Sequence, residues 1–370
     1  MRSDEKESGR LGAGGAAGRY FRRADDGHLV CELCPRACRL REGQRGVCFV
    51  RTCRDGEIAL SSYGRSTGFC IDPIEKKPLF HFLPGTPVLS FGTAGCNLTC
   101  KFCQNWETSR ARDVEHMSEA ATPDAIAAAA VRSGCQSVAM TYNDPVVFFE
   151  YAVDVADACH KVDIRTVAVT AGYMMALPRV EFYRHFDAAN VDLKAFSQRF
   201  YRDLCGGDLH SVLGTLVYLR AHTGVWLEIT TLLIPGENDS DTELDEMTRW
   251  LAANVGAEVP LHLSAFHPDF RLLDHPPTPL ATLRRARAIA LGNGLRHVYI
   301  GNVRDDEGSS TFCARCGQRL IGRAGYDVTA WALTDNGACK ACGATCAGRF
   351  DGMPGTWGNS RLPVVIAERA

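Results

Sequence analysis

Residues 88–103 have the sequence VLSFGTAGCNLTCKFC, and the rest of the chain is best understood outward from this stretch. It joins a β-rich run, Val88–Gly92, to three cysteines, Cys96, Cys100 and Cys103. Three thiolates are one fewer than the four that commonly hold a [4Fe–4S] cluster, so one iron would keep an open position for a small ligand. A zinc knuckle with a distant fourth ligand is the alternative that the spacing alone leaves open.

Strand-like and helix-like patterns alternate from this loop to about residue 305. The expected strands are 88–92, 137–142, 165–170, 188–194, 225–233, 260–266 and 297–302. Expected helices are 122–133, 146–160, 240–255 and 279–291, and Thr122 is placed to cap the first. Such alternation predicts a parallel sheet with right-handed crossovers. We expect an α/β fold, a partial (β/α)6-type TIM-like barrel over 79–305, with its site at the carboxyl ends of the strands.

Two segments precede the expected barrel. Residues 1–20 are charged and then rich in glycine and alanine, which predicts a disordered tail. Residues 21–78 form a small cysteine-rich module with four candidate metal ligands, Cys31, Cys34, Cys38 and Cys48. Four thiolates suit either zinc or a second iron–sulfur cluster, and the spacing does not choose between them. Arginines interleaved with these cysteines would stabilise anionic thiolates.

Residues 306–370 carry a third cysteine group. Its two Cys-x2-Cys pairs are Cys313 with Cys316 and Cys339 with Cys342, and a glycine follows each pair. This pattern predicts a zinc ribbon, in which bound metal supplies folding free energy to a segment too small for its own core. A redox role for the pairs is the alternative. Cys346 is a spare thiol that could replace a ligand.

Composition narrows the functional class. The chain has 370 residues, 17 cysteines and a formal net charge of -2. Clustered cysteines without a secretory signal favour metal ligation in a reducing compartment, so we expect a cytoplasmic protein. No apolar run is long enough for a membrane span. The near-neutral charge argues against nucleic-acid binding.

Several stretches resemble one superfamily. They are CELCPRAC, DPIEKKPLFHFLPG, GCNLTCKFCQNW, TYNDP, VDLKAF, LLIPGEND, FHPDF and GLRHVYIGNV, spread over residues 31–303. They resemble the radical S-adenosylmethionine (SAM) superfamily, in particular the branch of glycyl-radical-enzyme activases and, within it, the radical SAM enzymes of the AmmeMemoRadiSam system. The resemblance implies an enzyme whose [4Fe–4S] cluster cleaves SAM reductively. The resulting 5′-deoxyadenosyl radical would abstract hydrogen from a substrate that the sequence does not identify.

The resemblance also implies roles for single residues. Cys96, Cys100 and Cys103 would hold the cluster, and Asn143 and Asp144 would face the SAM ammonium. Lys194 and His267 would pair with the SAM carboxylate, and Asp192 shares a strand face with Lys194. Gly236 would lie near the methionyl and ribose groups, and Ile300 and Asn302 near the adenine.

Other interpretations of the chain stay open. Within the enzyme class, the substrate could be a protein glycine, a peptide or a metabolite, or a SAM fragment could be transferred instead. The alternative from another functional class is a non-catalytic binding module whose fold is stabilised by bound metal. The enzyme would need a reductant such as flavodoxin or ferredoxin, and the resemblance suggests Memo-type and AMMECR-type partners. Cys70, beside the polar run DPIEKKP, could donate hydrogen.

Overall fold

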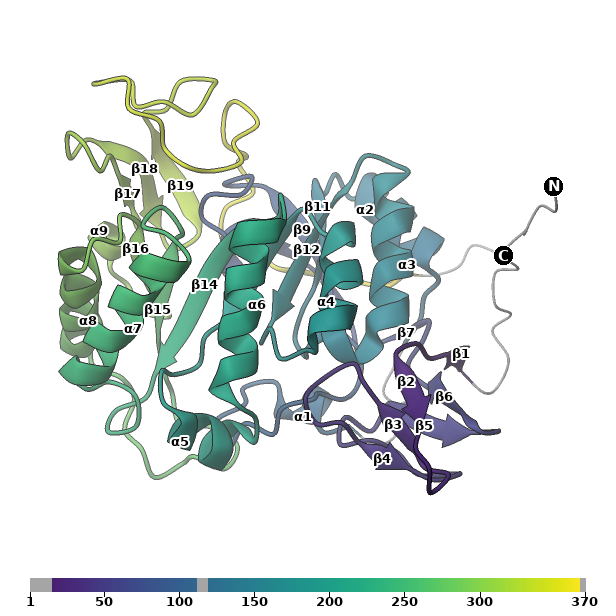
Figure 1. The fold of residues 1–370 in the computed structure, drawn as a ribbon. Helices are drawn as coiled ribbons and strands as arrows, with labels where there is room; N and C mark the ends of the chain where they lie inside the picture. The colour runs from purple at the N-terminus through teal and green to yellow at the C-terminus, as the bar shows by residue number, and fades with distance from the viewer. Residues whose placement is uncertain (1–14, 112–118, 367–370) are drawn as a thin grey trace.

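The computed structural model describes residues 15–111 and 119–366 (Figure 1). Within these residues, the main sheet has nine strands in the order β16-β15-β14-β13-β12-β11-β9-β8-β20. Its parallel strands are β9 (Pro87–Phe91), β11 (Ser137–Met140), β12 (Arg165–Thr170), β13 (Ala188–Asp192), β14 (Trp226–Leu233), β15 (Leu261–Ala265) and β16 (Val298–Gly301). These are the seven strands expected from the sequence, and the expected parallel α/β sheet is confirmed.

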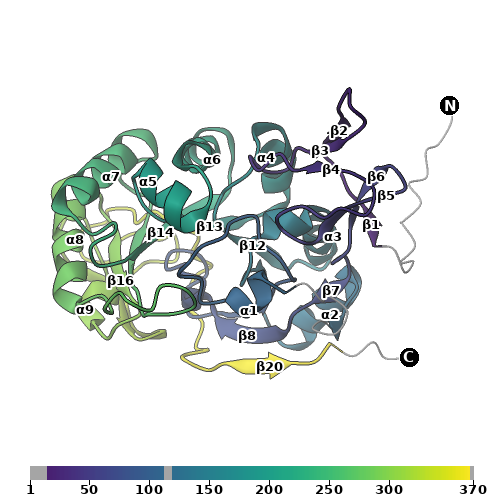
Figure 2. The same cartoon turned by 90° about the horizontal axis from the view of Figure 1, so that it is seen from below.

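Helices follow most of the parallel strands and lie along the outside of the sheet (Figure 2). They are α2 (Pro123–Arg132), α3 (Phe149–His160), α4 (Ala176–Phe182), α6 (Leu209–His222), α7 (Asp241–Asn254) and α8 (Leu280–Gly292). Thr122 caps α2 by accepting a hydrogen bond from the N–H of Ala125 at 3.2 Å, as expected. Helices α4 and α6 are not among those expected from the sequence, although Asp208 caps α6 by accepting from the N–H of Ser211 at 2.8 Å.

Short helical segments lie in the connections. They are α1 (Trp106–Ser109), α5 (Gln198–Phe200), α9 (Asp306–Ser309), η1 (Ile74–Lys76), η2 (Pro145–Phe148), η3 (Tyr183–His185) and the π-helical turn η4 (Tyr201–Cys205). No helix in the described part of the chain is long and apolar enough to cross a membrane.

The N-terminal module consists of small antiparallel sheets. Its strands are β1 (Ala16–Ala17), β2 (Phe21–Arg23), β3 (Leu29–Cys31), β4 (Arg39–Leu40), β5 (Arg51–Arg54), β6 (Glu57–Leu60) and β7 (Arg65–Ser66), and β7 pairs with β10 (Glu119–Ala120). Residues 1–14 of the expected tail lie outside the described residues. The end of that tail departs from the expectation, because β1 pairs with β6 through backbone hydrogen bonds.

The main sheet also extends past its expected boundaries at both ends of the chain. Strand β8 (Phe69–Pro73) lies before residue 79 yet pairs antiparallel with β9, and β20 (Leu362–Val364) returns from beyond residue 306 to pair with β8. β8 therefore has partners on both edges, which leaves few of its backbone groups unpaired.

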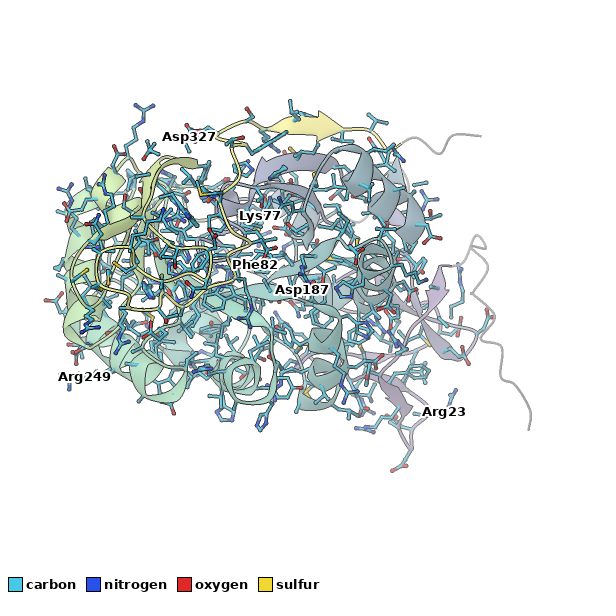
Figure 3. All side chains as sticks on the ribbon, turned by 90° about the horizontal axis from the view of Figure 1, so that it is seen from above. Arg23, Lys77, Phe82, Asp187, Arg249 and Asp327 are labelled. Carbon is cyan, nitrogen blue, oxygen red and sulfur yellow. The ribbon has the colours of Figure 1, made fainter. Side chains whose placement is uncertain are left out.

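The C-terminal module packs against the amino ends of the parallel strands. Its strands are β17 (Thr311–Phe312), β18 (Arg319–Ala324) and β19 (Asp327–Trp331). The N–H of Arg349 donates to the carbonyl of His81 at 2.7 Å, and the N–H of Leu83 donates to the carbonyl of Arg349 at 2.9 Å. Figure 3 views this end, with Phe82 labelled beside the yellow C-terminal chain. The purple N-terminal module lies at the opposite end of the sheet (Figure 1).

Candidate functional site

The three-cysteine loop follows β9 and is held on both sides. Gly95 has a φ of +87°, and a Cβ at this position would lie 2.0 Å from the carbonyl oxygen of Cys48. Only glycine fits this close approach. On the other side, the N–H of Thr99 donates to the carbonyl of Cys205 at 2.7 Å. The loop is thus fixed between the N-terminal module and the turn η4.

A cavity of about 260 Å³ lies between this loop and the carboxyl ends of the parallel strands. The predicted site residues that line it are Cys96, Cys100, Cys103, Asn143, Asp144, Asp192, Lys194 and Asn302. The loop brings the three thiols, while β11, β13 and β16 bring the others within or just beyond their last residues. Parallel strands place such groups at one edge of a sheet, so residues far apart in sequence meet here.

Lys194 supplies a positive charge to this cavity. Its Nζ donates to Oδ2 of Asp192 at 2.8 Å, and its carbonyl accepts from Nδ2 of Asn238 at 2.8 Å. Burial opposes the charge, but Asp192 and the nearby thiols of Cys100 and Cys205 outweigh it and raise the pKa of Lys194 well above its usual value. Lys194 is therefore a cation at neutral pH, suited to an anionic ligand group.

Asn143 braces the start of the cysteine loop. Its Oδ1 accepts from the N–H of Thr93 at 3.1 Å, and its Nδ2 donates to the carbonyl of Gly95 at 2.7 Å. The side-chain amide of Asn143 therefore holds the start of the loop in position.

Asp144 is held by the neighbouring strand. Its Oδ1 accepts from Thr170 Oγ1 at 2.9 Å, and its Oδ2 accepts from the N–H of Ala171 at 3.1 Å. Burial raises the pKa of Asp144, while these two hydrogen bonds and a third, from the N–H of Val146 at 3.0 Å, oppose the shift. The carboxylate is thus fixed against β12 at the cavity wall.

Three predicted site residues do not line the cavity formed by the described residues. His267 and Gly236 are exposed, and Ile300 is buried in contact distance of Gly308. Their proposed contacts with SAM stay predictions. His262 on β15 is buried, and its Nε2 lies 2.6 Å from Oε2 of Glu228 on β14.

A further thiol, that of Cys205, lies against the cysteine loop. It is fully buried at the end of η4, and its hydrogen bond with Cys100, together with burial, raises the pKa of Cys100 well above its usual value. Cys205 does not line the cavity in the described structure. Only the packing of η4 on the loop brings these thiols together, so no sequence spacing could have revealed the contact.

Cys70 lies away from the cavity. It sits on β8, opposite Ser90 of β9, and Nε of Arg361 contacts its sulfur at 3.2 Å. It is not among the residues that line the described cavity.

The C-terminal cysteines form a compact group. The sulfurs of Cys313, Cys316, Cys339 and Cys342 all lie within 4.8 Å of one another. Two of the separations are 3.6 Å, between Cys313 and Cys342, and 3.7 Å, between Cys316 and Cys339. This geometry suits one tetrahedral metal ion.

Cys346 belongs to a separate group. Its sulfur and a ring nitrogen each of His81 and His297 lie within 4.8 Å of one another, and all three residues are buried. Burial is the main cause that lowers the pKa of His81 to about 3. Its ring contacts Tyr299 and, at 2.6 Å, the carbonyl of Ala347. The three residues join the C-terminal module to the sheet.

Comparisons with known proteins cover the part of the chain that carries this site. A model of the radical SAM superfamily matches residues 91–247, which include the cysteine loop, Asp192 and Lys194. An uncharacterized protein of Methanocaldococcus jannaschii is 38% identical over 330 residues, covering 88% of this chain and 96% of its own length.

Solved structures are similar at lower identity. A radical SAM methyltransferase from Sphaerobacter thermophilus has a TM-score of 0.48 and 17% identity, covering 58% of this chain and 66% of that chain. A domain of pyruvate-formate lyase-activating enzyme from Bacteroides vulgatus has a TM-score of 0.41 and 17% identity, covering 45% of this chain and 99% of that chain. The family match thus covers the part of the chain that carries the cysteine loop, and this part is similar to the radical SAM superfamily.

Proposed function

We propose that Cys96, Cys100 and Cys103 hold a [4Fe–4S] cluster and that SAM occupies the adjoining cavity. The observation that carries the proposal is the cavity itself, in which three thiols and the Asp192–Lys194 pair face one space. Three thiols leave one iron of a four-iron cluster free, and the donor set therefore fits the group. A cluster bound there would supply one electron for reductive cleavage of SAM to methionine and a 5′-deoxyadenosyl radical.

The chain's own residues would bind SAM and shield the radical from water. Lys194 would pair with the SAM carboxylate, and Asn302, at the end of β16, would border the adenine. Phe102 is buried and packs against Phe200 with ring centroids 5.6 Å apart, so it closes one side of the loop to water. A dry cavity protects a radical from side reactions.

The radical would abstract hydrogen from a substrate held beyond the cavity. By the resemblance of its motifs, we place the enzyme in the activase-like branch, near the AmmeMemoRadiSam enzymes, with Memo-type and AMMECR-type partners. A flavodoxin- or ferredoxin-type protein would supply electrons. The parallel sheet would form a partial barrel, and the compact C-terminal thiols would hold zinc in a ribbon.

Anaerobic reconstitution tests this function. With SAM and dithionite, wild-type protein should form 5′-deoxyadenosine, and Cys100→Ala should abolish it. Cys135→Ala, at a buried thiol just after α2, is the matched control and should retain it. Lys194→Met should raise the KM for SAM by roughly tenfold or more, because a hydrogen bond to a charged group is lost. Another SAM fragment as product would support group transfer, and no SAM cleavage by a fully loaded cluster would refute the proposal.

A further inference from the structure

The N-terminal cysteines surround a pocket of their own. Cys31, Cys34, Cys38 and Cys48 all line it, and apolar side chains such as Val146 of η2 complete the wall. A Cβ at Gly46 would lie 3.6 Å from the sulfurs of both Cys38 and Cys48. The pocket is thus a place where four thiols converge among apolar and a few polar side chains.

These four sulfurs are more widely spread than those of the C-terminal group. Among the described residues, the groups of metal-ligating atoms within 4.8 Å of one another are the C-terminal four thiols and the set of His81, His297 and Cys346. The N-terminal thiols do not form such a group, and neither do the three thiols of the cysteine loop. One zinc ion with bonds of about 2.3 Å needs sulfurs within about 4 Å. In a [4Fe–4S] cluster each sulfur binds a different iron, so the thiolates stand farther apart.

Two arginines leave donors unpaired at this pocket. Arg36 and Arg51 line it, and both Nη2 of Arg36 and Nε of Arg51 are buried without a hydrogen-bond partner in the structure. A buried donor without a partner is unfavourable, and an anionic group in the pocket would relieve this. Four thiolates around a metal centre carry net negative charge, so the two arginines indicate that such a centre is bound here. The spacing of the sulfurs favours a [4Fe–4S] cluster over a single zinc ion.

The pocket adjoins the cysteine loop of the cavity. Asn97 lines the pocket, while its neighbours Cys96 and Leu98 line the cavity. Nε of Arg36 donates to the carbonyl of Asn97 at 2.9 Å. The carbonyl of Cys48 lies against Gly95 on the same loop. One stretch of backbone therefore forms a wall of both sites.

We infer that Cys31, Cys34, Cys38 and Cys48 bind an auxiliary [4Fe–4S] cluster, beside the loop that holds the first. It accepts one electron from a ferredoxin- or flavodoxin-type reductant and is reoxidised when it passes that electron to the cluster of the cavity. The electron-relay role rests on the proposed function. The identity of the bound centre does not.

Metal analysis of the full-length protein tests the inference. Wild type, reconstituted anaerobically with iron and sulfide, should contain about eight iron atoms and about one zinc per chain. The variant Cys96→Ala/Cys100→Ala/Cys103→Ala keeps the N-terminal module intact. It should retain about four iron atoms and show the electron paramagnetic resonance signal of a reduced [4Fe–4S] cluster after dithionite treatment.

The reciprocal variant, Cys34→Ser/Cys48→Ser, should lose about half of the iron and keep the zinc. Wild type with about four iron atoms and about two zinc ions, or a triple variant with no iron, would overturn the inference. A triple variant that keeps all the iron of wild type would instead refute the cluster in the cavity. The two failures are therefore distinguishable.

Discussion

The N-terminal and C-terminal modules each carry four cysteines, yet they lie at opposite ends of one sheet. The C-terminal sulfurs are compact, and their module packs on the amino ends of the strands, far from the cavity. The N-terminal sulfurs are spread around a pocket that shares a wall with the cysteine loop. Both modules have four thiol ligands, so the number of ligands does not distinguish them. The spacing of the sulfurs and the position in the fold do: they favour a structural ion in the C-terminal module and an electron-transferring centre in the N-terminal module.

A buried arginine of each module also contacts the central part of the molecule. Arg51 of the N-terminal module makes two hydrogen bonds with Glu150 of α3, at 2.8 and 3.0 Å. Arg323 of the C-terminal module donates to the carbonyl of Phe80 at 2.6 Å, and its Nε lies 3.7 Å from Oε1 of Glu75. The first arginine has a close carboxylate partner, while the second relies mainly on neutral acceptors. This difference can be tested by substitution.

The largest effect is expected from removing a C-terminal ligand. Cys339→Ser should abolish zinc binding and expose the C-terminal module to proteolysis, because an apparent metal-binding free energy of about 10–16 kcal/mol supports its fold. Iron content should not change, since this group lies at the other end of the sheet. Metal analysis measures the zinc and iron contents, and limited proteolysis measures the exposure of the module. Cys346→Ser is the matched control and should keep its zinc; equal loss from both variants would mean that the four thiols are not the site.

The next effect concerns the anchor of the N-terminal module. Glu150→Gln should lower the free energy of unfolding by about 3–5 kcal/mol, because it leaves the guanidinium of Arg51 buried without a counter-charge. Chemical denaturation of the apoprotein measures the change. Glu181→Gln removes the partner of Arg19, which is 41% exposed, and should change stability by less than about 1 kcal/mol. If both variants lost a similar free energy of unfolding, burial of the ion pair would not explain its contribution to stability.

Glu75 predicts a pH dependence at the C-terminal anchor. Burial raises its pKa from 4.5 to about 7, although Arg323 opposes the shift. Between these values the unfolded chain has lost the proton that the folded protein keeps, so stability should fall as pH rises from about 4.5 to about 7, by roughly 3 kcal/mol in all. Glu75→Gln should flatten this part of the profile of melting temperature against pH. An unchanged slope in the variant would show that Glu75 does not carry the effect.

The smallest effects are expected from thiols outside the two modules and the loop. Cys205→Ala should leave iron content unchanged and lower stability by about 1 kcal/mol, because only a small buried group is lost. Cys70→Ala should leave the yield of 5′-deoxyadenosine unchanged, since this thiol does not line the cavity. Loss of iron in the first variant would make Cys205 a cluster ligand, and loss of product in the second would give Cys70 a catalytic role.

Local sequence signals predicted the parallel strands well. Runs of buried β-branched residues such as 165–170 and caps such as Thr122 act within a few residues, so they can be recognised without the fold. The meeting of Asp192 and Lys194 with the cysteine loop was also predictable, because parallel strands end at one edge.

Contacts between segments that are distant in sequence were harder to predict. Pairing of β8 with β20 joins residues more than 290 positions apart, and neither strand has a pattern that specifies its partner. His267 and Gly236 lie in loops beyond their strands, where backbone conformation rather than strand geometry decides the direction of the side chain. The contact of Cys205 with Cys100 depends on the π-helical turn η4, which has no signature in the sequence.

Strand β20 has a consequence for how the molecule is made. Ribosomes synthesise the chain from its amino end, so β8 and the rest of the sheet emerge before Leu362–Val364. Until Leu362–Val364 pair, one edge of β8 offers unpaired backbone groups to any neighbouring chain. Nascent protein should therefore be prone to edge-to-edge association until this segment has emerged, and a translational pause before residue 362 should favour inclusion bodies.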